Sequence, residues 1–476
     1  MGYVNMKKFN KDKYLKKLRF KKYKRYLYIG IPCLLILLAG IYFAYSKFSV
    51  FKEEEVVRTT VGDFISGDDV IGAYIDGEYS KSIPGKNDGY VVEKIVCDND
   101  ATASWDKDAW GIALTNLTKR TKCNVYFETK KPSLNETVTT AMSNNPSMFA
   151  TDDSGKNARY IGADPSNYVY FNCSDYTNPT ADACELWRII GVFNNVTKGD
   201  GSKENLVKII RADSLGNYNW DYKEKGVGTS TNDNGSNDWS DSQLMMMLNP
   251  TNYLKSGYTN SSDIISSGSQ QLYSKMGSYY NGTKGCKPTA VASGAQFSCK
   301  EVDFTSTGLK NDTTRNAIEE VVWNLGGTSA YTSASNGLAS HWYGYERGTT
   351  VYTGRPTTWT GKIGLMYTSD YGYATSGGTT KDRAACLARE LYNWGSSDFS
   401  DCKGNDYLLD ANNYQWTLAP LSTYADYVFV VARGGGTVVG NLAKRTHAVR
   451  PVLFLKSNIQ VDKGTGAKSD PYRLKM

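Results

Sequence analysis

The runs Tyr427-Val-Phe-Val-Val-Ala-Arg-Gly-Gly-Gly436 and Ala448-Val-Arg-Pro-Val-Leu-Phe-Leu455 decide the fold that we expect for this chain. Both are rich in β-branched and aromatic residues, and a glycine-rich and then basic connector joins them. Apolar runs of this composition, bounded by turn residues, are typical of buried strands. We therefore expect residues 428–432 and 449–455 to pair as buried strands.

The N-terminus has the pattern of a membrane anchor. Residues 1–25 carry eleven Lys and Arg against one acid, Asp12, and residues 26–46 carry no charge and have tyrosines near both ends. About 20 apolar residues span a bilayer, and the positive flank stays in the cytoplasm. We predict a basic cytoplasmic tail (1–25), a single transmembrane helix (26–46) in the cell membrane and an extracellular C-terminus. A cleaved signal peptide is the alternative, although its apolar run has only about 7 to 15 residues.

The charge outside this tail argues against nucleic acid as a partner. The whole chain has a formal charge of +7, and subtracting the +10 of the tail leaves about −3 for the rest. Nucleic-acid binding depends on a basic surface that neutralises phosphates. The lysines of the tail are instead explained by attraction to anionic lipid headgroups.

The cysteines indicate an oxidising compartment. Cys33 lies in the predicted span, and the remaining eight follow it. An even set in an exported chain favours disulfides over reduced thiols, although eight cysteines allow 105 pairings. We prefer sequential pairs, each closing a local loop: Cys97 with Cys123, Cys173 with Cys184, Cys286 with Cys299, and Cys386 with Cys402.

We predict that the extracellular part begins with a stalk, which a small β domain follows. Residues 47–60 form a short charged stalk, and residues 61–128 alternate in strand fashion at 90–97, 110–115 and 123–127. Trp105 and Trp110 lie between Cys97 and Cys123, which suggests a small β-sandwich core with one disulfide. A unit of this size needs such a cross-link.

A helical joint (129–165) leads to the large domain (166–476). Ser133 and Glu136 have the spacing of a capping box at the start of a helix over 133–142. Three further helices are expected, at 241–248 with Ser240 as N-cap, at 313–325 and at 380–394. Between them, residues 251–310 and 328–361 are rich in Ser, Thr, Gly and Tyr, and loops of this length are usually functional.

Motifs for enzymatic chemistry are sparse. The chain has two histidines, His341 and His447, which excludes a His-rich zinc site, and it has no G-x-S-x-G motif. Residues 230–238 offer oxygen ligands like those of a calcium loop, but Ser230 stands where an EF-hand has Asp. We expect no cofactor, while leaving room for a structural calcium ion.

Several motifs resemble a known group of proteins. They are Leu186-Trp-Arg-Ile-Ile-Gly191, Gly364-Leu-Met-Tyr-Thr-Ser-Asp-Tyr371 and Val449-Arg-Pro-Val-Leu453. In them the chain resembles uncharacterised surface proteins of Gram-positive gut bacteria. Their C-terminal domain is similar to the C-type-lectin-like fold of formylglycine-generating enzymes and of the variable proteins of diversity-generating retroelements. This resemblance covers about residues 150–476 and implies an α+β class with a large C-type-lectin-like mixed domain.

The chain departs from those enzymes where their chemistry takes place. Arg433-Gly-Gly-Gly436 is close to their Arg-Gly-Gly-Ser, but no cysteine follows Cys402, so the oxidising cysteine pair is absent. We therefore expect no enzymatic activity, and we interpret Arg433 and Arg450 as structural residues that hold loop carbonyls or carboxylates.

The expected function is binding at the cell surface. We predict an adhesin or receptor-like protein that recognises an unknown extracellular protein or glycan through aromatic-rich loops. The predicted ligand residues are His341, Trp342, Tyr343, Tyr345 and Trp359. The competing interpretation places Trp342 and Trp359 in the core. An enzyme of the formylglycine-generating or cell-wall-modifying type is the alternative function.

Overall fold

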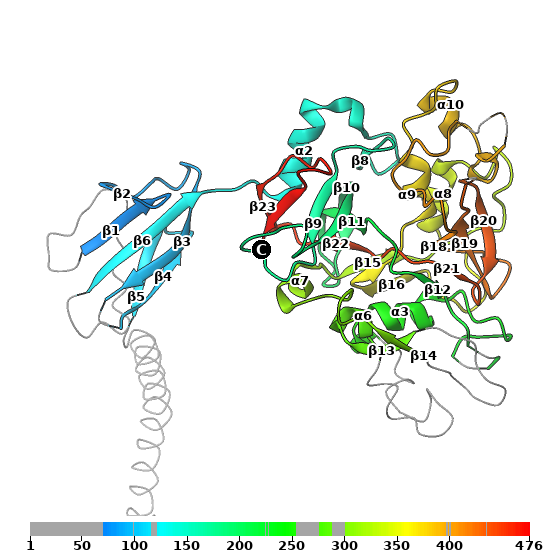
Figure 1. The fold of residues 1–476 in the computed structure, drawn as a ribbon, viewed down its shortest axis with the longest axis horizontal. Helices are drawn as coiled ribbons and strands as arrows, with labels where there is room; N and C mark the ends of the chain where they lie inside the picture. Colours follow the sequence, from blue (N-terminus) through cyan, green and yellow to red (C-terminus); the bar gives the residue numbers. More distant parts are fainter. Residues whose placement is uncertain are drawn as a thin grey trace, which may run out of the picture. The chain divides into compact units, whose positions relative to one another are not determined.

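The computed structural model describes residues 70–98, 100–115, 121–223, 225–226, 228–253, 276–287, 300–396, 398, 401–434 and 436–476. The chain divides into two compact units, residues 1–130 and 131–476 (Figure 1).

The first unit is a small β structure. Its four-stranded sheet has the order β2-β1-β6-β3, and β4 and β5 form a separate hairpin. Cys123, Val125 and Phe127 alternate along β6 into the core, and the ring of Trp105 lies 5.3 Å from that of Phe127. The strands are β1 (Val70–Ile75), β2 (Glu78–Ser80), β3 (Tyr90–Cys97), β4 (Thr102–Asp106), β5 (Gly111–Thr115) and β6 (Lys122–Thr129).

A nine-stranded sheet forms one layer of the second unit. Its main path is β17-β22-β11-β10-β9-β24-β23, and β8 joins β10 and β7 at the side. The long hairpin of β10 and β11 lies at its centre. The strands are β7 (Phe149–Ala150), β8 (Ala158–Tyr160), β9 (Tyr168–Phe171), β10 (Glu185–Thr197), β11 (Lys203–Arg211), β17 (Ile363–Gly364), β22 (Val452–Leu455), β23 (Gln460–Lys463) and β24 (Tyr472–Lys475).

A five-stranded sheet, of order β12-β21-β18-β19-β20, is the second large sheet. Two antiparallel two-stranded sheets, β13 with β14 and β15 with β16, complete the described strands of this unit. The strands are β12 (Asn217–Asn219), β13 (Lys284–Lys287), β14 (Lys300–Asp303), β15 (Val321–Asn324), β16 (Thr358–Gly361), β18 (Gln415–Pro420), β19 (Tyr427–Val431), β20 (Val438–Leu442) and β21 (Thr446–Ala448).

The described helices are short. The α-helices are α2 (Leu134–Asn144), α3 (Gln243–Leu248), α6 (Ser278–Asn281), α7 (Asp312–Ala317), α8 (Ala339–Glu346), α9 (Thr368–Tyr373) and α10 (Arg383–Leu387). The 3-10 helices are η1 (Pro146–Met148), η2 (Trp239–Asp241), η3 (Thr251–Tyr253) and η5 (Leu391–Asn393).

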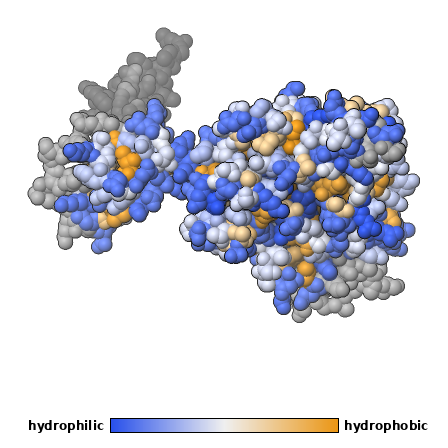
Figure 2. Space-filling model, turned by 45° about the horizontal axis from the view of Figure 1, so that its top comes forward, coloured by the Kyte–Doolittle hydropathy of each residue, from blue (hydrophilic) through white to orange (hydrophobic). Residues whose placement is uncertain are grey.

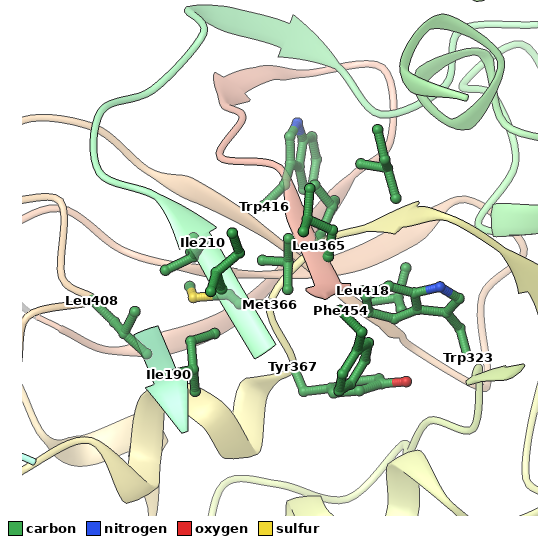
Figure 3. Close-up of a cluster of buried hydrophobic side chains, with 14 of the residues drawn as sticks. Ile190, Ile210, Trp323, Leu365, Met366, Tyr367, Leu408, Trp416, Leu418 and Phe454 are labelled. Atoms are coloured by element: carbon green, nitrogen blue, oxygen red, sulfur yellow. The ribbon is translucent and has the colours of Figure 1, made fainter. Parts of the chain in front are cut away.

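The two large sheets share one hydrophobic core. Ile190 and Ile210 from the nine-stranded sheet belong to one cluster of buried side chains with Met366 and with Trp416 and Leu418 of β18 (Figure 3). The backbone N–H of Leu418 also donates to the carbonyl of Met366 at 3.0 Å. All five side chains are at most 1 % exposed, so this contact sets the relative position of the sheets.

The expectation that residues 428–432 and 449–455 pair with each other is wrong. Strand β19 pairs with β18 and β20, whereas β22 pairs with β11 and β17 in the other sheet. Both runs are buried strands, but the connector between them contains β20 and β21. Apolar composition identifies a buried strand and carries no information about its partner.

The α+β class with a C-type-lectin-like mixed domain is also corrected, because the part of the chain that the structure describes is mostly β, with 35 % strand and 16 % helix. The predicted helix over 313–325 shows the reason. Only α7 forms there, and strand β15 follows it. Val321 and Trp323 are buried and alternate with half-buried neighbours, a two-residue period that the helical spacing of the same segment concealed.

Other helix boundaries differ in a similar way. Helix α3 is capped by Ser242 and not by Ser240, which lies in η2. The predicted helix over 380–394 consists of α10 and then η5. The predicted start of the helix at Ser133 is confirmed. Ser133 caps α2 and forms the capping box with Glu136.

The prediction of a single-pass membrane protein is contradicted. Within the described ranges, no helix is long and apolar enough to cross a bilayer. The predicted tail, span and stalk, residues 1–60, lie outside the described residues.

Disulfides form between predicted neighbours in sequence. Cys97 is bonded to Cys123, Cys173 to Cys184 and Cys386 to Cys402. Cys286 is disulfide-bonded as well, and its predicted partner Cys299 lies outside the described residues. In the first unit the bond joins directly opposed residues of β3 and β6.

Buried charges attach α8 and α9 to the nine-stranded sheet. Asp370 of α9 accepts from Arg159 Nη1 of β8 at 2.7 Å and from the ammonium of Lys208 in β11. Arg159 also donates to Asp153 at 2.5 Å. Next to this network, Glu346 at the end of α8 accepts from the N–H of Ser369 at 2.8 Å. Burial raises the pKa of Glu346 to about 7.

The first unit depends on its disulfide. Replacing Cys97 and Cys123 by Ala opens a loop with a sequence separation of 26, which by chain entropy costs about 3 kcal/mol in the free energy of unfolding. We expect this unit to lose its protection from hydrogen exchange while residues 131–476 keep theirs. Val96→Thr, at an exposed position in the same strand, is the control and should leave both patterns unchanged. Full protection of the double Ala variant would contradict the prediction.

Glu346 should make stability depend on pH. Its folded pKa of about 7 exceeds the value of about 4.3 in an unfolded chain, so the folded state binds this proton more tightly. The resulting stabilisation is complete below about pH 4 and is lost as the pH rises towards 7. Glu346→Gln should therefore reduce the loss in free energy of unfolding between pH 5 and pH 8 by about 2 to 3 kcal/mol.

Chemical denaturation at both pH values measures this effect. Asp221 and Asp406, whose pKa values burial raises to about 6, titrate in the same direction and should leave a residual slope in the variant. Asp182→Asn, at an exposed position, is the control for replacing a carboxyl group by an amide. An identical pH slope in Glu346→Gln and in the wild type would show that the prediction is wrong.

Candidate ligand-binding surface

Most of the predicted ligand residues are buried. Trp342 and Tyr343 of α8 are 0 % and 9 % exposed, and Trp359 of β16 is 8 % exposed. The ring of Trp359 packs 5.6 Å from that of Tyr253 and 6.2 Å from that of Trp239. For the two tryptophans, the structure agrees with the competing interpretation that they belong to the core.

His341 and Tyr345, also on α8, are half-buried and hold their own helix. The Nδ1 atom of His341 accepts from the N–H of Leu338 at 3.4 Å, and the hydroxyl of Tyr345 donates to the carbonyl of Asn336 at 3.1 Å. The five predicted residues therefore form no common exposed surface.

Exposed aromatic side chains occur at a different place. Tyr424 is 56 % exposed and Tyr392 is 38 % exposed, and each packs against a half-buried tyrosine. The rings of Tyr424 and Tyr427 lie 5.1 Å apart, and those of Tyr392 and Tyr331 lie 5.7 Å apart. We call Tyr331, Tyr392, Tyr424 and Tyr427 the tyrosine strip.

Phe429 joins the two tyrosine pairs. It lies two residues after Tyr427 on the same face of β19, and the ring of Tyr331 packs on it at 4.8 Å. Gly440 of β20 lies opposite Phe429, and a Cβ atom there would lie 3.6 Å from Tyr427 and 4.0 Å from Phe429. Phe429 itself is fully buried, so it connects the two pairs beneath the surface, and the solvent-exposed rings are those of Tyr392 and Tyr424.

Trp342 supports this surface from below. Its ring lies 4.6 Å from Phe429 and 6.2 Å from Tyr331. The predicted ligand residue therefore contributes by fixing the aromatic rings above it.

A buried asparagine shapes the turn that presents Tyr424. The side-chain amide of Asn237 donates to three carbonyls of the β18–β19 turn, those of Leu421 at 3.1 Å, Tyr424 at 2.7 Å and Tyr427 at 3.2 Å. Its backbone N–H donates to Ala425 at 2.8 Å. Three carbonyls of one turn share a single buried donor group, so the turn has one preferred conformation.

The calcium-like loop over 230–238 supports the same turn. The side-chain amides of Asn232 and Asn234 donate to Asp426 Oδ2 at 3.0 Å and 2.8 Å. Across the described residues, no group of three or more His, Cys, Asp and Glu side chains could hold a metal ion. The polar side chains of this loop bind the hairpin.

Two hollows lined by described residues of this unit differ from an apolar ligand pocket. A cavity of about 10 Å³ beside Asn237 and Trp239 has room for roughly one water molecule. An open groove of about 530 Å³ between α2 and the β10–β11 hairpin is lined by polar residues alone. The face shown in Figure 2 is mostly hydrophilic, with hydrophobic residues in small separate groups. We therefore take the tyrosine strip as the candidate binding surface.

The two arginines that we predicted to be structural, Arg433 and Arg450, differ in burial. Arg450 is buried and donates to the carbonyls of Arg211 at 2.8 Å and Leu408 at 3.0 Å, which is the kind of contact that we expected. Arg433 is exposed in the turn between β19 and β20.

Sequence reasoning missed the tyrosine strip. Tyr424 had a usable signal, because it lies in the short turn Leu421-Ser-Thr-Tyr-Ala425 between two apolar runs. Tyr331 and Tyr392 lie 61 positions apart and meet only through tertiary packing.

Comparison with known proteins found no match: no family model, no curated protein and no solved structure is similar to this chain. The resemblance to surface proteins with a C-type-lectin-like domain is untested by these comparisons.

Asn237 should matter more for stability than its size suggests. Asn237→Ala removes the donor shared by three turn carbonyls, which should cost about 2 to 3 kcal/mol in the free energy of unfolding. Proteolysis at the β18–β19 turn should also become faster. Asn412→Ala, at an exposed position, is the control. Wild-type stability of Asn237→Ala would show that the turn does not depend on this side chain.

Proposed function

We propose that residues 131–476 form the ligand-binding domain of an exported protein, and that the ligand is a neutral glycan lying along the tyrosine strip. The observation that carries this proposal is the pair of exposed rings, Tyr392 in η5 and Tyr424 in the β18–β19 turn, each packed against a half-buried tyrosine.

The disulfides support export. Three disulfides are formed within the described residues, in both compact units of the chain. Such bonds persist in oxidising compartments and are rare in the reducing cytosol. A ligand in the extracellular space fits this chemistry.

The surface offers its rings at low entropic cost. Tyr331 packs on Phe429, which itself packs on the fully buried Trp342, so a ligand finds this ring already in place. Preorganisation of this kind reduces the cost of binding. Tyrosine also combines an apolar face with a hydroxyl group, as a sugar ring combines apolar C–H faces with hydroxyl edges.

The size and charge of the strip favour a glycan over a protein. A stable protein interface buries about 800 Å² on each partner, more than four tyrosines provide. None of the four side chains carries a charge at neutral pH, and the turn beside Tyr424 adds the neutral hydroxyls of Ser422 and Thr423. These groups suit the hydroxyl groups of an uncharged sugar chain.

Binding by the purified full chain tests the proposal. A glycan array identifies a neutral oligosaccharide, and titration calorimetry then measures its affinity. Tyr424→Ala and Tyr392→Ala should each weaken that affinity by about tenfold or more, since anchoring aromatic residues contribute over about 1.4 kcal/mol. Tyr79→Ala, in the first unit and 66 % exposed, is the matched control and should bind like the wild type.

Three outcomes would contradict the proposal. One is an array on which no neutral glycan binds. The second is wild-type affinity in the double variant Tyr392→Ala/Tyr424→Ala. The third is a protein ligand, captured on a protein array, whose binding the same double variant abolishes.

A further inference from the structure

Lys223 is a buried cation between two buried carboxylates. Its Nζ atom lies 2.6 Å from Asp241 Oδ2 and 3.9 Å from Asp221 Oδ1, and all three side chains are 0 % exposed. Asp241 ends η2, and Lys223 follows β12 by four residues. Tight enclosure of an amine against a carboxyl group holds two reactants at a high effective concentration.

We propose that Lys223 and Asp241 become joined by an amide bond between Nζ and Cγ, with Asp221 as the proton carrier. This covalent cross-link within the chain is independent of the glycan function proposed above.

The reaction balances without any other reagent. The lone pair of the neutral amine attacks Asp241 Cγ and forms the C–N bond. Asp221 accepts a proton from the nitrogen and returns one to the departing oxygen, after which the C–O bond breaks. One water molecule leaves, nothing is oxidised or reduced, and Asp221 ends in its starting state.

The reaction needs a neutral amine and a protonated carboxyl group, so one proton first passes from the ammonium of Lys223 to Asp241. Burial disfavours charge on both the amine and the carboxyl groups. It raises the pKa of Asp221 to about 6, which lets this carboxyl group hold and release a proton near neutral pH.

Thr229 is positioned to stabilise the charge that develops during the attack. Its backbone N–H and its hydroxyl donate to Asp241 Oδ2 at 2.8 Å and 2.9 Å. Two fixed donors on one oxygen polarise the carbonyl and stabilise the negative charge of a tetrahedral intermediate.

A second buried pair provides an internal comparison. Lys208 also contacts a buried carboxylate, that of Asp370, but Arg159 donates to the same group at 2.7 Å. The two neighbouring cations lower the pKa of Asp370 to about 2. An ionised carboxylate resists attack by an amine, so we expect this pair to stay an ion pair.

The cross-link would strengthen the support of the binding surface. It closes the loop from Lys223 to Asp241, which contains Asn232, Asn234 and Asn237, the residues that hold the β18–β19 turn. Closing a loop of this length removes conformations from the unfolded chain.

Peptide mapping of the purified full chain tests the proposal. After reduction and alkylation, trypsin cannot cleave behind a lysine whose amine is acylated. We expect residues 212–225 and 226–255 to appear as one linked species, lighter by one water than the two peptides together. Free peptide 212–223 together with unlinked 226–255 would overturn the proposal, and this readout on the wild type requires no variant.

Variants test whether Lys223 supplies the amine and whether Asp221 carries the proton. Lys223→Arg keeps the positive charge and should lose the link, so that the mass of one water is regained. Lys225→Arg, at an exposed position in the same loop, should keep it. Asp221→Asn should slow link formation after refolding, and unchanged kinetics would remove Asp221 from the mechanism. A link between Lys208 and Asp370 in the wild type would overturn the proposed selectivity.

Discussion

Charges enclosed in the core of residues 131–476 must each meet an opposite charge or a set of donors, because an isolated buried ion is very costly. This constraint joins parts of the chain that are distant in sequence. Arg159 and Lys208 of the sheet meet Asp370 of α9, and Glu346 of α8 meets Ser369. The helices are thereby held in one position, although they are too short to be stable by themselves.

Similar constraints act at the β18–β19 turn. Asn237 saturates three turn carbonyls from below, and Asp426 receives two asparagine amides. The residues that hold the turn belong to one polar loop, whose composition suggested a calcium site. Its side chains bind a hairpin, and the hairpin carries Tyr424 into solvent. The polar loop therefore holds the turn in place, and the turn exposes the tyrosine to solvent.

Sequence patterns were reliable where the physical cause is local. Ser133 and Glu136 lie three residues apart and form the predicted capping box. Cys97 and Cys123 are bonded as expected from their order in the sequence. The patterns failed where a segment suits two structures: residues 313–325 satisfy a helical and a two-residue period, and sheet pairing with β16 decided for a strand after Ala317. Aromatic character likewise did not separate core from surface, as the buried Trp342 shows.

The sequence by itself determined that the two apolar runs near the C-terminus are buried strands, how α2 begins and which cysteines are bonded to their neighbours in sequence, because these depend on side chains close together along the chain. Only the tertiary structure decided that β19 and β22 belong to different sheets, that Tyr331 meets Tyr392, and that Lys223 lies between Asp221 and Asp241. Such contacts depend on how strands and helices pack around a common core. Whether one side of a strand or helix is buried or exposed is decided only when the other elements pack against it.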